Sequence, residues 1–298
     1  MLTVLLVALG LGALVYLVVL VRALIAQGRF AVNLEALGLG AVANFFDTLG
    51  IGSFAPTMAW MKLRRMVPDR LIPCTMLVGY TLPPLVQAVI FLTLLGVFVD
   101  PVLLAGCVVA LVAGGLVGAP LVRRAKVWVV QLVVGLALVI AACLYAAANL
   151  HLMPGGGTAA SLPPLLTVVA IGANFVFGVL LNFGVGNYAP TLVLLSLMGM
   201  DPRYCFPIMA AGAALMAVGA SVRHIKAGEI DLRIVVGLAI GGIPAVLVAA
   251  FIVKSMPVEI LRWLVIVVVL YAAAAMLREA LRRRDQPVAC APDPTAAA

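Results

Sequence analysis

Long apolar runs alternate along this chain with short segments that carry the charges. Six of these runs contain no charged residue and are long enough for the roughly 20 residues that cross the hydrocarbon core of a bilayer. They are residues 2–21, 71–99, 101–122, 127–150, 204–222 and 234–253. A seventh run, residues 263–277, becomes long enough if its helix begins near Pro257. The pattern predicts an all-α polytopic membrane protein with seven spanning helices, the first retained with its start outside.

Composition supports the same environment. Hydrophobic residues make up 65% of the chain and charged residues only 10%, with a mean hydropathy of +1.26. Too few polar side chains are present to cover the surface of a soluble domain. The formal charge of +8 does not indicate a nucleic-acid partner, because the basic residues cluster at helix ends, as the positive-inside rule describes.

Two stretches do not fit single upright spans. Residues 31–61 carry several polar side chains, residues 152–200 carry no charge at all, and both are longer than one crossing requires. Each contains one copy of a motif, GIGSFAPT at 50–57 and GVGNYAPT at 184–191, and the same spacing relates Met66 to Met200. We infer an internal duplication, with an extra helix at 1–29, repeat A at 30–150 and repeat B at 160–280. Residues 285–298, rich in Pro and Ala, are predicted to be disordered.

The distribution of positive charge distinguishes two topologies. If the motif segments cross the membrane, the basic residues divide almost evenly between its sides. If each segment dips in and returns, all of them except Arg203, Lys254 and Arg262 fall on one side. Positive loops mark the cytoplasm, which favours re-entrant segments, two inverted repeats, an inner-membrane location and a cytoplasmic C-terminus. The crossing topology remains the alternative.

The repeated motif has the chemistry of a buried helix start. Paired glycines allow a tight reversal, Ser53 and Asn187 are favoured N-cap types, and Pro56 and Pro190 are tolerated in a first turn. A helix N-terminus at mid-membrane presents free N–H groups and a positive dipole end, which attract an anion and imply a surrounding cavity. Glycines could instead serve only close helix packing. The motif residues expected to bind substrate are Gly50, Gly52, Ser53, Gly184, Gly186 and Asn187.

Further polar side chains flank the motifs. Asp47 precedes the first motif, and a carboxylate at this depth is costly, so we expect it to couple a proton or cation, or else to serve as a fixed internal hydrogen-bond partner. Asn44, Thr48 and Asn182 could bind an oxyanion or satisfy opened backbone groups. Pro83 and Pro84 predict a break in the second run, because neither residue has an N–H to donate.

The segments ANFFDTLGIGSFAPT and VLLNFGVGNYAPT resemble the TauE/SafE sulfite-exporter family of membrane permeases. The resemblance extends over about residues 30–280. It implies transport of sulfite, an organosulfonate or a similar small anion.

Together these observations predict a secondary transporter that moves a small anion by alternating access. No Walker motif is present, so ATP is not expected to drive it. An anion channel and a membrane scaffold or sensor are the alternatives; an enzyme is not expected, because the apolar spans lack a His pair or an acidic cluster. The expected partners are the small anionic substrate, the lipid bilayer, a possible coupling proton or cation and a possible second copy of the chain, with no cofactor, metal or catalytic residues.

Overall fold

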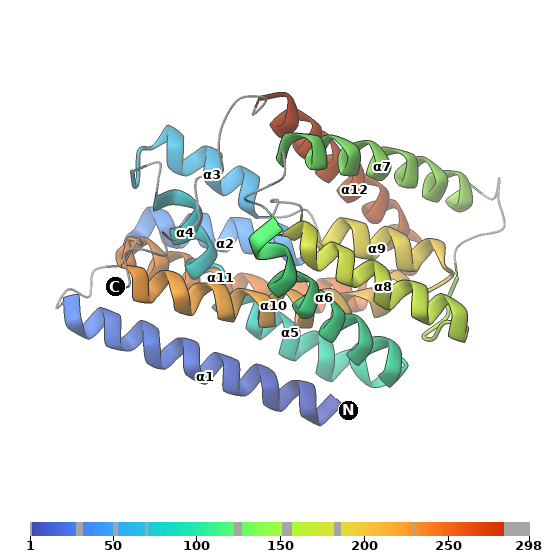
Figure 1. Ribbon diagram of the computed structural model, residues 1–298, viewed down its shortest axis with the longest axis horizontal. Coiled ribbons are helices and arrows are strands. Elements are labelled where there is room, and N and C mark those ends of the chain that lie inside the picture. Colours follow the sequence, from blue (N-terminus) through green and yellow to red (C-terminus); the bar gives the residue numbers. More distant parts are fainter. Residues whose placement is uncertain are drawn as a thin grey trace.

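The computed structural model describes residues 2–27, 32–49, 53–68, 71–121, 127–150, 157–181, 186–228 and 230–282. These residues are helical almost throughout, and the helices run roughly along the long axis of the molecule (Figure 1). In chain order they are α1 (Leu2–Gln27), α2 (Leu34–Thr48), α3 (Phe54–Leu63), α4 (Ile72–Gly79), α5 (Leu82–Leu94), η2 (Gly96–Phe98), α6 (Pro101–Leu121), α7 (Val127–Asn149), α8 (Pro164–Leu181), α9 (Tyr188–Leu197), α10 (Pro202–Ala227), α11 (Leu232–Ser255) and α12 (Val258–Arg282).

Within the described ranges, eight helical segments are long and apolar enough to cross a membrane. Seven of them correspond to the seven predicted spans. The eighth is α8, which the sequence assigned to a re-entrant segment. Its 18 residues correspond to about 27 Å at 1.5 Å per residue, so its length alone is sufficient for a crossing.

The predicted break in the second span is confirmed. The helix stops after Gly79 and restarts at Leu82, with Pro83 and Pro84 in the first turn of α5. Side chains supply donors to carbonyl groups next to the break: Thr81 Oγ1 donates to Leu77 O at 2.9 Å, and the hydroxyl of Tyr16 in α1 donates to Val78 O at 2.6 Å. The N-terminal helix therefore helps to satisfy a backbone carbonyl group next to the break, inside an apolar bundle.

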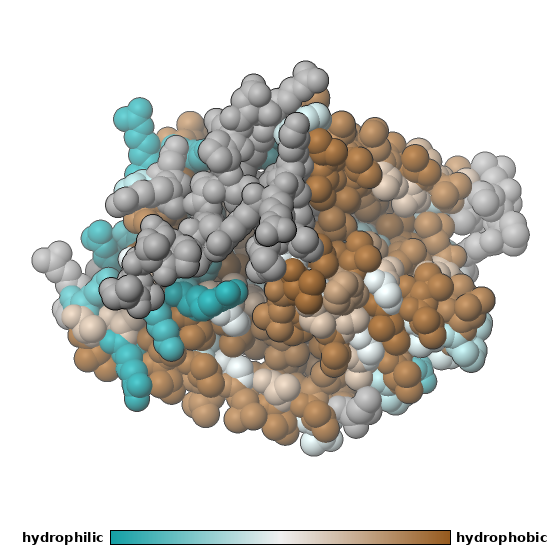
Figure 2. All heavy atoms as spheres, viewed as in Figure 1, coloured by the Kyte–Doolittle hydropathy of each residue, from teal (hydrophilic) through white to brown (hydrophobic). Residues whose placement is uncertain are grey.

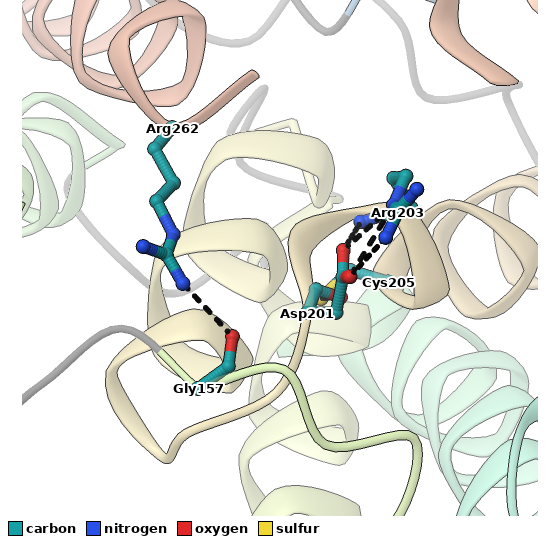
Figure 3. Close-up of polar contacts among 5 residues, drawn as sticks. All are labelled: Gly157, Asp201, Arg203, Cys205 and Arg262. Carbon is teal, nitrogen blue, oxygen red and sulfur yellow. Dashed lines mark hydrogen bonds and ion pairs between the residues drawn. The ribbon is translucent and has the colours of Figure 1, made fainter. Parts of the chain in front are cut away.

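In each motif segment, the start of the first helix lies beside the end of the second helix. In the first, Glu35 near the start of α2 pairs with Arg64 at the end of α3, at 2.7 Å. In the second, the backbone before α8 pairs with the backbone after α9, because the Asp201 N–H donates to Ala159 O at 3.0 Å. Figure 3 shows the same region, where Arg262 of α12 donates to the Gly157 carbonyl at 3.3 Å.

The two closures lie at opposite ends of the bundle. Helix α10 starts at Pro202, directly after its N-cap Asp201 and beside the second closure. Beyond its far end, the Asp231 N–H donates to Thr75 Oγ1 near the start of α4, where the α1 and α11 ends also pack. Figure 1 accordingly shows α2–α3 and α8–α9 entering the molecule from opposite ends of its long axis.

The first helix of each motif segment packs mainly on a helix of the other half. Helix α2 makes its most extensive contact with α11, and α8 makes its most extensive contact with α6. Both interfaces are close enough to require glycine: a methyl group on Gly241 would overlap the Leu37 carbonyl, and one on Gly178 would overlap the Leu111 carbonyl. Each segment is thus held by close backbone packing against one long helix.

The outside of the bundle is largely apolar. Figure 2 shows hydrophobic residues over much of one face, with hydrophilic side chains gathered toward the end where α3 and the C-terminal ends of α1 and α10 lie. Large apolar side chains such as Val4, Leu11, Val102, Leu165 and Val168 are more than half exposed. Such a surface is suited to lipid and not to water.

Candidate functional site

Helices α3 and α9 both begin near the middle of the long axis of the molecule (Figure 1), α9 among buried residues and α3 with Phe54 and Pro56 exposed. The residues that precede them, Ser53 and Asn187, are each only 2% exposed. The first backbone hydrogen bonds of the two helices run from Thr57 N to Ser53 O and from Thr191 N to Asn187 O, at 3.2 and 3.1 Å. The first turns therefore leave backbone N–H groups without partners inside the helix, as the motif predicts.

The expected side-chain caps are wrong. Ser53 and Asn187 stand at the N-cap positions, but neither side chain makes a capping hydrogen bond, and both backbones are in the helical region. The third helical residue, Pro56 or Pro190, has no N–H, which removes one of the two backbone donors that such a cap could bind. Instead Asn187 Nδ2 donates to Met209 O of α10 at 3.2 Å.

A carboxylate lies at the buried start of α3. The backbone N–H of Ser53 donates to Asp47 Oδ1 at 2.8 Å, and Asp47 itself is half-buried. This is the fixed hydrogen-bond partner that the sequence left open as one alternative for Asp47. It also shows that this helix start holds a negative group, as its dipole favours. A coupling role for Asp47 stays a prediction.

The flanking polar side chains mostly satisfy their own helices. Asn44 Nδ2 donates to Gly40 O and Thr48 Oγ1 donates to Asn44 O, each at 2.8 Å. The structure thus gives both residues a backbone role, and oxyanion binding by them is untested. Asn182, Gly50, Gly52 and Gly184 lie outside the described residues, whereas Gly186 is described and exposed.

The threonines that follow the prolines both make internal hydrogen bonds. Thr57 Oγ1 and the Tyr80 hydroxyl lie 2.6 Å apart, which ties α3 to the break between α4 and α5. Thr191 Oγ1 donates to Asn174 Oδ1 at 3.3 Å and ties α9 to α8. Asn174 was not among the residues expected at the site, although an asparagine in an uncharged run is a visible signal.

Sequence reasoning also missed Gln87 of α5. Its side chain is fully buried, and neither amide atom has a hydrogen-bond partner among the described residues. It lies beside the Tyr188 hydroxyl at the start of α9, which is likewise buried and unpaired there, although the two groups fall short of hydrogen-bond geometry. The Asp47 carboxylate lies within electrostatic range of the Tyr188 hydroxyl. The buried ends of the two motif segments therefore approach one another near Gln87.

Two hollows in the surface lie away from these helix starts. One, of about 490 Å³, is lined by Lys62, Arg65, Met66, Val67 and Pro68 after α3. The other, of about 230 Å³, lies at the opposite end and is lined by residues of α1, η2 and α6 and by Val99. The cavity expected at the motif is not one of these two, so the hollows mark the ends of the bundle and not its centre.

These features define a multi-pass α-helical membrane protein in which two helices start inside the bundle. Residues 154–297 match the family model described as Sulfite exporter TauE/SafE. The family resemblance seen in the motifs is confirmed over that part of the chain, which contains α8 to α12 and the second motif. A search of the curated proteins and a search of the solved structures found no match.

Proposed function

We propose that this protein is a secondary transporter that carries a small oxyanion, such as sulfite or an organosulfonate, across the inner membrane. The match to a sulfite-exporter family supports membrane transport of such an anion. The observation that carries the proposal is the hydrogen bond from the Ser53 N–H to the Asp47 carboxylate at the start of α3. Here a backbone N–H at a helix start already binds a negatively charged group, and we propose that a transported anion binds at the same helix start.

The architecture that we propose for transport is a pair of inverted repeats. Its support is the closure of the two motif segments at opposite ends and the equivalent packing of α2 on α11 and α8 on α6. Two such halves can rock against one another and open a central site first to one side and then to the other.

Asp47 provides a way to couple this movement to protons. When ionised, its carboxylate occupies the Ser53 N–H and repels a second anion. When protonated, it loses the negative charge that competes with substrate at the helix start. A proton and an anion would then bind to the same conformation, which gives co-transport down a proton gradient.

The test is uptake of sulfite into proteoliposomes that contain the purified full chain. An imposed inward proton gradient should drive accumulation of sulfite above its external concentration. A channel would only equalise the two concentrations, and a scaffold or sensor would produce no flux.

A pair of serine variants then assigns the flux to the central site. Ser53→Leu should abolish uptake, because the larger apolar side chain fills the helix start, whereas Ser161→Leu alters an exposed serine at the end of the bundle and should leave uptake intact. Thermal unfolding in detergent checks that both variants fold. Full uptake by a folded Ser53→Leu variant would remove α3 from the site.

A further inference from the structure

Gln87 has a polar side chain in an unfavourable position inside the membrane bundle. Its amide is fully buried on α5, and neither its nitrogen nor its oxygen has a hydrogen-bond partner among the described residues. Burial of an amide without partners costs free energy, and buried polar groups in native proteins are nearly always paired. An apolar side chain of similar size would stabilise this helix better, so the amide is available to a partner that the described residues do not supply.

The surroundings of Gln87 identify where that partner would lie. Pro83, one turn earlier on α5, and the amide of Asn44 on α2 both lie against Gly242 of α11, where a methyl group would contact them. The Tyr188 hydroxyl, which also has no partner among the described residues, belongs to the first residue of α9 and lies beside Gln87. Gln87 therefore lies at the start of α9, one turn along α5 from the contact of Pro83 with Gly242.

We infer that Gln87 and Tyr188 bind the transported anion directly, at the point where the two motif segments meet. This inference rests on the proposed transport function. The Gln87 nitrogen and the Tyr188 hydroxyl can donate to ligand oxygens, while the first-turn N–H groups of α3 and α9, which have no partners inside their own helices, supply the positive ends of two helices. One residue comes from each half of the chain, so the contact would form and break as the halves move.

The hydrogen-bonding capacity of the two residues also defines the ligand. The Gln87 amide has an oxygen that accepts as well as a nitrogen that donates. A fully deprotonated oxyanion can satisfy only the donors, and it would leave the Gln87 oxygen unpaired. An anion that keeps one hydrogen, such as hydrogensulfite, satisfies both ends of the amide. The site therefore favours a singly protonated oxyanion over sulfate or a simple sulfonate.

The experiment measures binding of three probes to the purified full chain by calorimetry, slightly below neutral pH. Sodium sulfite supplies hydrogensulfite, methanesulfonate is a monoanion without an acidic hydrogen, and sulfate is a dianion. We expect sulfite to bind most tightly. Gln87→Leu and Tyr188→Phe should each weaken sulfite binding by roughly 10- to 100-fold, the loss expected for a hydrogen bond to a charged group.

Stability without ligand separates a binding role from a structural one. Because the Gln87 amide has no hydrogen-bond partner among the described residues, Gln87→Leu should keep or raise the unfolding midpoint. Tyr145→Phe is the matched control: its hydroxyl is also buried and unpaired among the described residues, but it lies on α7, and its loss should leave sulfite binding unchanged.

Each outcome bears on a different claim. If sulfite binds to the wild type and binds equally well to Gln87→Leu and Tyr188→Phe, this inference is overturned and the transport proposal stands. A lowered unfolding midpoint for Gln87→Leu would also overturn it, since the amide would then be structural. Equal binding of sulfite, methanesulfonate and sulfate would overturn the preference for a protonated ligand. Absence of binding and transport for every anion would instead refute the proposed function.

Discussion

At the scale of single residues, the buried polar groups divide into those with partners in the chain and those without. Asn44 and Thr48 donate to their own helix, and Asp47 accepts from the Ser53 N–H. Gln87 and the Tyr188 hydroxyl have no partner in the described part of the chain. The paired residues support the fold, because leaving a buried polar group without a hydrogen bond costs free energy. Gln87 and Tyr188 differ from other unpaired groups, such as the Tyr145 hydroxyl on α7, because they lie at the start of α9.

Asp47→Asn should separate the charge of this residue from its hydrogen bond. The asparagine oxygen can still accept from the Ser53 N–H, so we expect the variant to fold and to transport. Sulfite flux should no longer respond to a pH gradient across proteoliposomes, because the titrating group is gone. Asp231→Asn, at the N-cap of α11, is the control and should keep the wild-type response. An unchanged pH response in Asp47→Asn would give Asp47 a structural role only.

Glu35 provides a pH-dependent contact at the entrance of the first motif segment. The hydrogen bond from Arg64 lowers the pKa of the Glu35 carboxyl below its ordinary value of 4.5. The contact therefore stabilises the folded state above the unfolded-state pKa, and its contribution is lost as the pH falls through the lower folded-state pKa. Because the pair is exposed, its contribution is small.

Unfolding of Glu35→Gln in detergent tests this contact. The variant should unfold at a slightly lower temperature than the wild type near neutral pH, and the difference should vanish in acid. A difference that persists at acid pH would show that the effect does not depend on ionisation of Glu35.

At the scale of elements, two glycine-lined interfaces hold the motif segments. Helix α2 approaches α11 at Gly40 and Gly241, and α8 approaches α6 at Gly114 and Gly178, in each case against backbone of the other helix. Lipid gives no hydrophobic drive for helices to associate, so close backbone packing of this kind supplies much of the attraction. If the two halves move relative to one another during transport, the helices must either keep these contacts or slide along one another at them.

Gly241→Ala should destabilise the α2–α11 interface, because the added methyl group overlaps the Leu37 carbonyl. We expect a loss of about 1–3 kcal/mol in the free energy of unfolding, as for other overpacked sites. Gly38→Ala is the matched change on α2, where no atom lies within 4 Å of the added methyl group. It should be neutral or stabilise the helix by up to about 1 kcal/mol. Equal unfolding midpoints for the two variants would contradict the close packing.

At the scale of the whole molecule, the ends of the bundle differ in charge. The end with the first closure carries many of the described basic residues, including Arg22, Lys62, Arg64, Arg223 and Lys226. Arg203 and Arg262 lie near the second closure. The positive-inside rule then orients the first closure toward the cytoplasm, a prediction that awaits measurement.

Single cysteines in a cysteine-free background test this orientation in intact cells, with a membrane-impermeant thiol reagent. Leu34→Cys and Lys62→Cys, at the two ends of the α2–α3 segment, should both be protected from outside. Ser161→Cys and Arg203→Cys, at the two ends of the α8–α9 segment, should both react. Reaction of one member of either pair without the other would mean that its segment crosses the membrane.

The sequence by itself determined the properties that depend on local order along the chain. Apolar runs of spanning length predicted seven helices that the structure contains, Pro83 and Pro84 predicted the break between α4 and α5, and the repeated motif located the starts of α3 and α9. These features follow from hydropathy, missing N–H donors and backbone freedom of nearby residues.

Only the tertiary structure decided which groups meet. It placed Asp47 on the Ser53 N–H in place of a side-chain cap, and it brought Gln87 beside Tyr188, a residue far along the chain. Local patterns carry no information about such encounters, because they depend on how α2, α5 and α9 pack. The site proposed here therefore combines helix starts that are visible in the sequence with partners that folding alone assembles.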